Sequence, residues 1–406
     1  MRQSTLAIFA SAVTLILGPI TATAATSSIN CTAGPELAAA VAAAQPADTI
    51  DFGGVCSGPI NVAQNNLTLD GGGNGIIDGG GANNALVVTG AHGVTLQNLT
   101  VRNGVSGIVI QTTASAALTN LTVSAAAFDS VMITGTSTAT ISNSVLTGTP
   151  INGVDVESTS SVIFTGTTSS SGAIAFGINI GTGSSMTLTG ASVTVSNNGL
   201  GVQVGIGASA FIDPTSSLTA LNNTTTGVTA VSGSHIVVFG GKLESDNNLI
   251  NGFSADSRSG IDLDAASTLT THGNRQDGVH LEETSLLNMF NTTNFSGVPG
   301  PTKLITHNNG MAGIRVLGNS EFHMHNQVAM VCQNNGLDGI SLDNGSAATV
   351  IRSQITGNIG NDVALSFGSR GDLTLSTIGK INCDATSLIR GDTGITCPFS
   401  PPSTHQ

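Results

Sequence analysis

Five charged residues stand at two outward positions of a repeated motif and belong to the residue types that carry acid–base chemistry. They are Asp262, Asp264, His280, Glu282 and Arg315. The motif is a glycine followed by apolar-x-apolar, as in GIDL at 260–263, GVHL at 278–281 and GIRV at 313–316. Each of the five stands at x or two residues after it. These positions point outward from a strand whose apolar residues point inward, so stacked repeats would gather all five into one patch.

Two kinds of sugar chemistry would suit this patch. Asp264 and Glu282, on neighbouring repeats, would lie about 5 Å apart, which suits the carboxylate pair of a retaining glycoside hydrolase. Alternatively, His280 or a carboxylate would abstract a sugar C5 proton while Arg315 stabilises the developing enolate, as in lyases and epimerases. The interpretation we prefer is a solvated face on which Asp262, His280 and Arg315 pair across strands, and metal or ligand binding is a further alternative.

Two segments longer than the repeat requires flank the patch, LINGFSADSRSG at 249–260 and NTTNFSGVPGPT at 291–302. Such insertions often carry function. The first also leaves the register open, because Gly252 fits the 25-residue spacing from Gly227 as well as Gly260 fits the motif. The placement of Asp262 therefore has two solutions that differ by one strand.

Charge and aromatic content restrict the substrate. The chain has 11 Lys and Arg against 24 Asp and Glu, a formal net charge of −13, so polyanions such as nucleic acids and uronate polymers would be repelled at long range. It contains no Trp or Tyr, whose faces commonly hold sugar rings. Calcium could bridge acid to acid only through an organised carboxylate cluster, so no cofactor is expected. Glu321, His323 and His325 alternate on one strand and could hold Zn or Cu. Two histidines on one strand with no identified third ligand are, however, more often surface residues.

The motif also defines the architecture. Its segments start at 107, 130, 153, 177, 201, 227, 260, 278, 313, 339 and 362, with Ser at 130 and Asp at 362 in place of glycine, and most starts are 23 to 26 residues apart. A unit of this size alternates with period two and cannot bury its own apolar residues, whereas stacked units bury them in one continuous column. We predict an all-β, single-stranded right-handed parallel β-helix of about twelve coils.

Asparagine marks one corner of each coil. It stands four residues before the motif at Asn197, Asn223, Asn274, Asn309, Asn335 and Asn358. Asparagine tolerates left-handed backbone, and its amide can bond to the asparagine one coil above and below. We therefore expect an asparagine ladder.

The ends differ from the repeats. Residues 1–24 read as a signal peptide, with a basic start, an apolar core too short for a comfortable membrane span and a small-x-small cleavage site. Residues 25–65 form an N-terminal cap with a helix near 35–44, residues 66–380 the β-helix, and residues 381–406 a C-terminal cap and tail.

Cysteine usage agrees with export to an oxidising compartment. Cys31 and Cys56 bracket the start of the mature chain, while Cys383 and Cys397 bracket its end, so we expect two terminal disulfides. Cys332 is expected to be a buried structural thiol.

Several stretches resemble right-handed parallel β-helix proteins of the pectin-lyase-like superfamily. They are the Ala-rich segment followed by ADTIDF at 47–52, LTLDGGG at 67–73, IIDGGG at 76–81 and VTLQNLTVRNG at 94–104. The resemblance covers nearly the whole mature chain and implies the fold. The chain lacks the paired-Asp, Gly-His-Gly and Arg-x-Lys pattern of polygalacturonase-like relatives and the Arg-x-Pro-x-x-Arg pattern of pectate lyases, so the resemblance assigns no catalytic residue.

We predict an exported β-helix rod with a structural, surface-interaction or adhesion role, in the periplasm, outside the cell or at the cell surface. The alternative is a polysaccharide-active enzyme, a lyase, glycoside hydrolase or epimerase, with its site on the outward face of coils 260–320. The expected partner is a polysaccharide or a cell-surface ligand and not a nucleic acid. The mature chain is expected to be a monomer without a membrane span.

Overall fold

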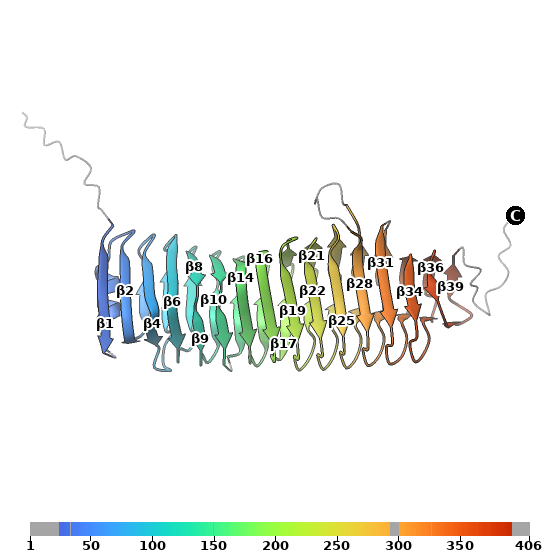
Figure 1. The fold of residues 1–406 in the computed structure, drawn as a ribbon, viewed down its shortest axis with the longest axis horizontal. Helices are drawn as coiled ribbons and strands as arrows, with labels where there is room; N and C mark the ends of the chain where they lie inside the picture. Colours follow the sequence, from blue (N-terminus) through green and yellow to red (C-terminus); the bar gives the residue numbers. More distant parts are fainter. Residues whose placement is uncertain (1–23, 33, 149, 293–299, 326, 392–406) are drawn as a thin grey trace, which may run out of the picture.

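The chain winds into a rod of stacked, parallel β-coils (Figure 1). The computed structural model describes residues 24–32, 34–148, 150–292, 300–325 and 327–391. A 14-stranded sheet, here sheet B, receives one strand from each coil, and a 25-stranded sheet, here sheet A, receives the rest. The predicted right-handed parallel β-helix is confirmed, with 14 coils against the expected twelve. The additional coils lie at the ends, where the glycine motif is absent.

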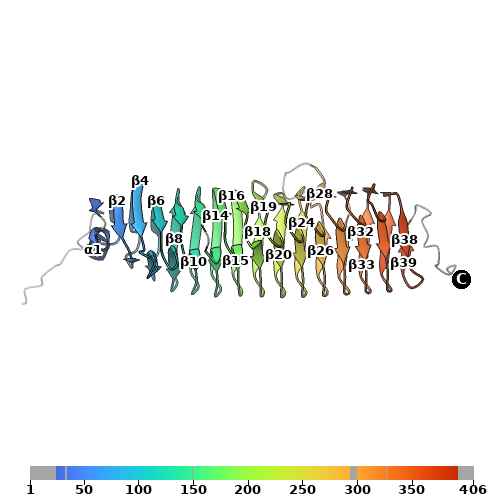
Figure 2. The ribbon, with the colours of Figure 1, turned by 90° about the horizontal axis from the view of Figure 1, so that it is seen from below.

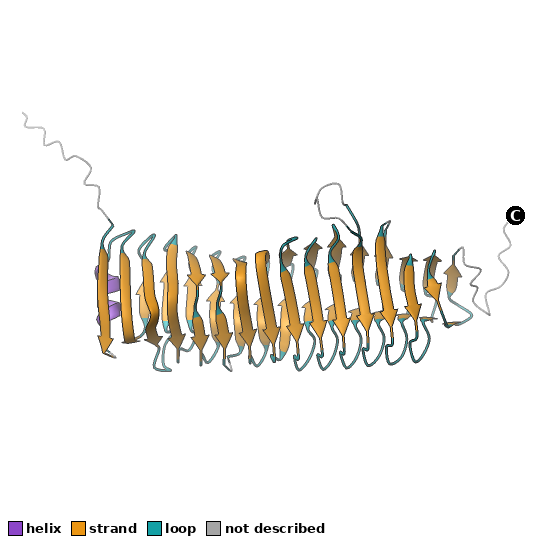
Figure 3. Cartoon of the chain, in the orientation of Figure 1, coloured by secondary structure: helices purple, strands orange, loops and turns teal. Residues whose placement is uncertain are grey.

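Figure 3 shows how completely strands dominate the described part of the chain, with one short helix at the first coils. Sheet B comprises β3 (Ile60–Val62), β5 (Leu86–Thr89), β7 (Ile108–Gln111), β10 (Asp129–Ile133), β13 (Asn152–Val156), β15 (Phe176–Ile180), β17 (Leu200–Val204), β20 (Val228–Ala230), β23 (Phe253–Ala255), β26 (Val279–Leu281), β29 (Ile314–Val316), β32 (Ile340–Leu342), β35 (Val363–Leu365) and β38 (Ile381–Cys383).

Sheet A comprises β1 (Thr26–Thr32), β2 (Thr49–Ser57), β4 (Thr68–Asp78), β6 (Val94–Arg102), β8 (Ser115–Thr119), β9 (Thr122–Ser124), β11 (Thr138–Ser142), β12 (Val145–Thr147), β14 (Ser161–Ser171), β16 (Ser185–Ser196), β18 (Ser209–Ile212), β19 (Ser217–Leu221), β21 (His235–Phe239), β22 (Lys242–Asp246), β24 (Gly260–Asp264), β25 (Thr268–His272), β27 (Leu286–Met289), β28 (Thr302–His307), β30 (Glu321–Met324), β31 (Val328–Gln333), β33 (Ala347–Ile351), β34 (Ser353–Thr356), β36 (Arg370–Thr374), β37 (Thr377–Ile378) and β39 (Leu388–Arg390).

Inward-facing aliphatic side chains fill the hollow between the sheets. On sheet B one such column is almost fully buried and stays in register from coil to coil, through Val202, Val228, Phe253, Val279 and Ile314. Each buried side chain of this size contributes roughly 1.5–3 kcal/mol of hydrophobic stabilisation. Because the column is continuous, each coil is stabilised mainly by its two neighbours.

A column of asparagines closes the corner that leads into sheet B. Its members are Asn198, Asn223, Asn248, Asn274, Asn309, Asn335 and Asn358. At each step the backbone N–H and the Nδ2 group of one asparagine donate to the Oδ1 atom of the next, as between Asn223 and Asn248 at 3.0 and 2.9 Å. The predicted ladder is therefore confirmed, and it includes Asn248.

One member of the predicted ladder is wrong. Asn197 is exposed with a φ of 57°, and Asn198 takes its place in the column. The turn that follows Asn198 is one residue shorter than the turn after Asn223, which shifts the spacing. The left-handed backbone also lies one residue before the ladder, with φ of 56° at Asn222, Asn247, Asn308 and Asn334. The left-handed backbone and the ladder hydrogen bonds, which we expected at one asparagine of each coil, therefore belong to two consecutive residues.

The ladder ends at a carboxylate. Asn358 donates its backbone N–H and its Nδ2 to Oδ1 of Asp362 at 3.2 and 2.8 Å, and Oδ2 of Asp362 accepts the backbone N–H of Lys380 at 2.6 Å. Every amide in the column therefore points its donors toward the C-terminal end, where a negative charge receives them. Hydrogen bonds to an ionised acceptor are stronger than those between neutral groups, so Asp362 is a suitable last acceptor.

Helix α1 (Glu36–Ala43) covers the N-terminal end of the core with its buried Leu37 and Val41, as expected (Figure 2). The predicted Cys31–Cys56 disulfide is present and joins β1 to β2. The predicted Cys383–Cys397 pairing and the signal peptide involve Cys397 and residues 1–23, which lie outside the described residues. In the part of the chain that the structure describes, no helix is long and apolar enough to cross a membrane.

Cys332 is the buried thiol that the sequence predicts. It is fully buried, and its Sγ donates to the carbonyl oxygen of Gly339 at 3.1 Å. Burial raises the pKa of the Cys332 thiol to about 12. A thiol in this state is not a nucleophile at neutral pH.

Candidate functional site on sheet B

The structure settles the register that the sequence left open. Strand β23, which follows Gly252, occupies sheet B and pairs Phe253 with Val228 on one side and Val279 on the other. Strand β24, which carries GIDL, lies in sheet A. Asp262 and Asp264 are therefore not neighbours of His280, and their predicted place in the patch is wrong. Each coil has more than one strand with the same alternation, so the motif alone could not tell the sheets apart.

On sheet A, Asp262 and Asp264 are tied to other partners. Asp262 bonds to Nε2 of His235 at 2.9 Å and accepts Nδ2 of Asn288 at 3.0 Å. Burial raises the pKa of Asp262, but these two hydrogen bonds outweigh it and hold the pKa below its usual value. Asp264 accepts the backbone N–H and the Oγ1 hydroxyl of Thr292 at 2.8 and 2.7 Å. The proposed Asp264–Glu282 hydrolase pair does not form, because its members lie on different sheets.

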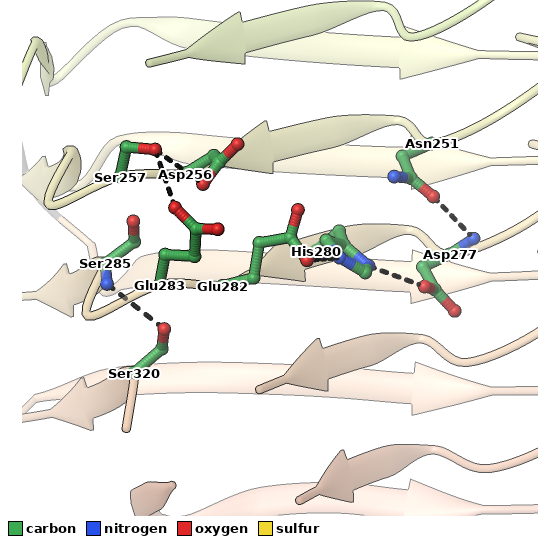
Figure 4. Close-up of polar contacts among 9 residues, drawn as sticks. All are labelled: Asn251, Asp256, Ser257, Asp277, His280, Glu282, Glu283, Ser285 and Ser320. Atoms are coloured by element: carbon green, nitrogen blue, oxygen red, sulfur yellow. Dashed lines mark hydrogen bonds and ion pairs between the residues drawn. The ribbon is translucent and has the colours of Figure 1, made fainter. Parts of the chain in front are cut away.

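His280, on β26, is held between two carboxylates (Figure 4). Its Nδ1 lies 2.9 Å from Oδ2 of Asp277, and its Nε2 lies 3.4 Å from Oε2 of Glu282. Burial lowers the pKa of His280, but the two carboxylates raise it by more, so the imidazolium form is favoured. Both ring nitrogens are engaged.

Asp277 is the residue that positions His280. Its side chain is only 2% exposed, its Oδ1 accepts the backbone N–H of Ala312 at 2.9 Å, and its own N–H donates to Oδ1 of Asn251 at 3.1 Å. The carboxylate is therefore fixed by the coils on either side. Sequence analysis missed Asp277; the available signal was the Asp or Asn that directly precedes glycine at Asn251, Asp277 and Asp338.

Arg315 lies beside His280 on the next strand, as predicted. Within the described residues its guanidinium has no hydrogen bond or ion pair. It lines a cavity of about 140 Å³ together with Asp277, Met311, Ala312, Leu337, Asp338 and Ser341. Three of the five predicted residues, His280, Glu282 and Arg315, are thus brought together on sheet B, and they combine a fixed imidazole, a carboxylate and a free cation.

A second acidic group lies on the same face, nearer the N-terminus. Nδ2 of Asn179 donates to Oδ1 of Asp155 at 2.8 Å and to Oε1 of Glu157 at 3.4 Å, which places the two carboxylates close together. Asp129, one coil earlier, accepts Nδ2 of Asn152 at 3.0 Å. Burial raises the pKa of Asp129, and burial together with the neighbouring acids raises the pKa of Asp155 to about 6. Perturbed carboxylates of this kind often mark functional surfaces.

The raised pKa of Asp155 predicts a pH-dependent stability. Its folded-state pKa of about 6 lies above the reference value of 3.8, so the folded state binds more protons between these values. The free energy of unfolding should therefore fall as the pH rises from about 4 to 6. Asp155→Asn keeps an acceptor for Asn179 and should be more stable than wild type at pH 7 by about 1–2 kcal/mol. Denaturant unfolding at several pH values measures this, and parallel pH profiles for the two proteins would contradict it.

Comparison with known proteins agrees with the observed fold. Residues 84–285 match the family model described as "Right handed beta helix region". The match and the observed coils together show that the chain has the right-handed β-helix fold. A search of curated proteins gives no match.

Solved structures similar to this β-helix protein include three carbohydrate-active enzymes. The pectate lyase Pel9A has 13% identity and a TM-score of 0.41, over 66% of this chain and 76% of that one. The periplasmic alginate epimerase AlgG has 12% identity and a TM-score of 0.40, over 86% and 76%. The catalytic domain of a GH87 α-1,3-glucanase has 12% identity and a TM-score of 0.19, over 91% and 62%. Likenesses at this level assign no activity to the β-helix protein described here.

The two alternating histidines, His323 in β30 and His325 directly after it, already have side-chain partners in this β-helix protein. Nε2 of His323 pairs with Glu321 at 2.8 Å, and His325 stacks on Phe290 with ring centroids 4.5 Å apart. Across the described residues, no three His, Cys, Asp or Glu side chains converge in a way that could enclose a metal ion. The predicted Zn or Cu alternative at Glu321, His323 and His325 therefore has no support in this geometry.

Proposed function

We propose that the protein is an exported β-helix rod that adheres to an extended polysaccharide along the outer face of sheet B. One observation carries the proposal. A single row of mostly polar or charged side chains stays in register over eight successive strands, through Asp155, Asn179, Gln203, Thr229, Ser254, His280, Arg315 and Ser341. Five of its members are partly exposed, namely Gln203, Ser254, His280, Arg315 and Ser341, whereas Asp155, Asn179 and Thr229 are buried. Because successive coils lie about 4.8 Å apart, a linear polymer with regularly spaced hydroxyl groups could bond to several of the exposed members at once.

The charges along the row favour a neutral or sparsely acidic glycan. The partly exposed Glu157 stands near one end and would accept hydrogen bonds from sugar hydroxyls, while Arg315 stands near the other with its guanidinium free. A planar guanidinium suits a carboxylate or an acidic substituent. The net charge of −13 would repel a densely charged polyanion.

Adhesion fits the site better than turnover does. The cavity beside Arg315 is only about 140 Å³, which is smaller than typical ligand pockets. His280 has both ring nitrogens engaged and favours the protonated form, so it is not a free base. Export is supported by the Cys31–Cys56 disulfide and by the predicted signal peptide.

Binding to immobilised neutral and acidic glycans, with residues 25–406 as the sample, tests the proposal. Gln203→Ala and Arg315→Ala should each weaken binding to the glycan that wild type selects by about 5- to 10-fold, the cost of one or two hydrogen bonds. Gln354→Ala and Arg370→Ala, which alter the same residue types on sheet A, should leave binding unchanged. Equal losses in both pairs, or no glycan bound by wild type, would contradict the proposal.

A second candidate is an eliminase or epimerase, favoured by the Asp277–His280 pair. A buried carboxylate that orients an imidazole is a common arrangement for a general base. With Glu282 moved away from Nε2, the neutral form of His280 would take the C5 proton of a uronate, and Arg315 would stabilise the enolate. In elimination the C–O bond to the leaving sugar breaks, a C=C bond forms, and the leaving oxygen takes up a proton. Unsaturated, ultraviolet-absorbing products in the same glycan screen, lost in His280→Asn, would favour this candidate over adhesion.

A further inference from the structure

Two histidines on the outer face of sheet A lie directly against each other. His272 ends β25 and His307 ends β28, and the two residues are in register on adjacent coils. Their ring centroids are 4.5 Å apart, with an interplanar angle of 42°. Both side chains are partly exposed. Their place on parallel, hydrogen-bonded strands fixes the two imidazoles as neighbours without any further ordering of the chain.

This pair differs from the other paired histidines in having no carboxylate at ion-pair distance, although Asp246 interacts with His272 at longer range. His235, His280 and His323 each lie within 3.0 Å of an Asp or Glu oxygen. The described structure gives His272 and His307 no such ion pair. One ring nitrogen is engaged, Nδ1 of His307 with Nδ2 of Asn308 at 3.3 Å. Burial, together with the neighbouring His272, lowers the pKa of His307.

Asp246 stands one coil earlier in the same column. It pairs in register with His272, so Asp246, His272 and His307 follow one another on three successive coils. Its Oδ1 atom is buried and has no hydrogen-bond partner. A buried carboxylate oxygen without a partner is costly and requires an explanation, one of which is an ion or a water that it serves.

We propose that His272 and His307 together bind a divalent first-row transition-metal ion, with Cu²⁺ the tightest and Ni²⁺ and Zn²⁺ weaker. Imidazole is a good ligand for these ions, and copper binds most tightly in the usual order of affinities. Because no three described ligands enclose a point, water completes the coordination and the ion is exchangeable. Asp246, in register with His272 on the preceding coil, adds a negative charge close to the pair and so favours a bound cation.

The electrostatic surroundings favour a cation here. Glu244 and Asp246 lie on the same strand, and the whole chain carries a net charge of −13. The lysines of β22 and β28, Lys242 and Lys303, stand toward the opposite end of these strands, four residues before Asp246 and His307. Asn308 can orient the His307 ring through its side-chain amide, whichever way that amide is turned. The site lies on sheet A, and its occupancy does not depend on glycan binding to sheet B.

Calorimetric titration of untagged protein, residues 25–406, with Cu²⁺ tests the proposal. Wild type should bind one ion per chain at this site. His272→Asn and His307→Asn should each weaken that binding at least about 10-fold, and Asp246→Asn should weaken it less. His323→Asn removes another partly exposed histidine of sheet A and should have no effect, so an equal loss in that variant would overturn the assignment.

Electron paramagnetic resonance of the copper-loaded wild type gives a second readout that needs no variant. Two coordinated imidazoles should produce hyperfine structure from two nitrogen atoms. A spectrum without nitrogen coupling, or the absence of a bound ion, would overturn the proposal even if the histidine variants failed to fold.

Discussion

Replacing Asn309 with alanine should lower the free energy of unfolding by about 3 kcal/mol or more. Asn309 is buried, and its Oδ1 accepts the backbone N–H and the Nδ2 group of Asn274 at 3.2 and 3.0 Å. Its own Nδ2 donates to Oδ1 of Asn335 at 3.0 Å. The substitution therefore leaves several buried polar groups unpaired, each at a cost of about 1–3 kcal/mol. Chemical denaturation followed by circular dichroism measures the loss.

Asn334→Gly is the matched control for Asn309→Ala. Asn334 precedes a ladder residue, is exposed and has a φ of 56°, a backbone conformation that glycine adopts without strain. Its replacement should change stability by less than about 0.5 kcal/mol. Similar losses in the two variants would show that the corner is stabilised by something other than the ladder.

Because coils contact only their neighbours, the unfolding transition of Asn309→Ala should also become broader than that of the wild type.

Replacing Phe253 with alanine should cost about 3–5 kcal/mol, the usual range for a buried phenylalanine. Phe253 is fully buried in the inward column of sheet B, between Val228 and Val279. The alternative register, in which Gly260 begins the sheet B strand, would put Phe253 in a surface insertion. The same denaturation measurement therefore tests stability and register together.

Leu249→Ala is the control for Phe253→Ala. Leu249 lies in the same segment, residues 249–260, but is 50% exposed, so its truncation should change the free energy of unfolding by less than about 0.5 kcal/mol. A stability loss below about 1 kcal/mol in Phe253→Ala would mean that β23 does not belong to the core.

The fold could be predicted from the sequence because the same physical requirement recurs in every coil. An apolar pair facing inward and an asparagine at the corner were visible at Val279, Leu281 and Asn274, and these residues lie where expected. Asn197 was assigned wrongly because the prediction assumed a constant distance of four residues between the asparagine and the motif glycine. The turn between Asn198 and Gly201 is one residue shorter. The expected number of coils was too low because β3, β5 and β38, at the two ends of sheet B, lack the glycine motif.

The candidate site was predicted less well, for a related reason. His280, Glu282 and Arg315 were found because they occupy outward positions of sheet B. Asp262 was assigned to that face although β24 belongs to sheet A, and alternation is the same on both sheets. Asp277 lies in the turn before the strand, where periodicity gives no direction for a side chain. Its contact with His280 follows from the turn geometry, which only the three-dimensional structure shows.

The direction of the asparagine column limits how such a rod can grow. Between Asn198 and Asn358, each ladder asparagine accepts hydrogen bonds from the preceding coil and donates the same kind of hydrogen bonds to the following coil. A duplicated interior coil would therefore find a donor on one side and an acceptor on the other. Beyond Asp362 this is no longer true, because the carboxylate offers no amide to pass on. Adding or removing one whole interior coil would therefore leave no ladder group without a partner, whereas Asp362 ends the asparagine column although one more strand, β38, follows on sheet B.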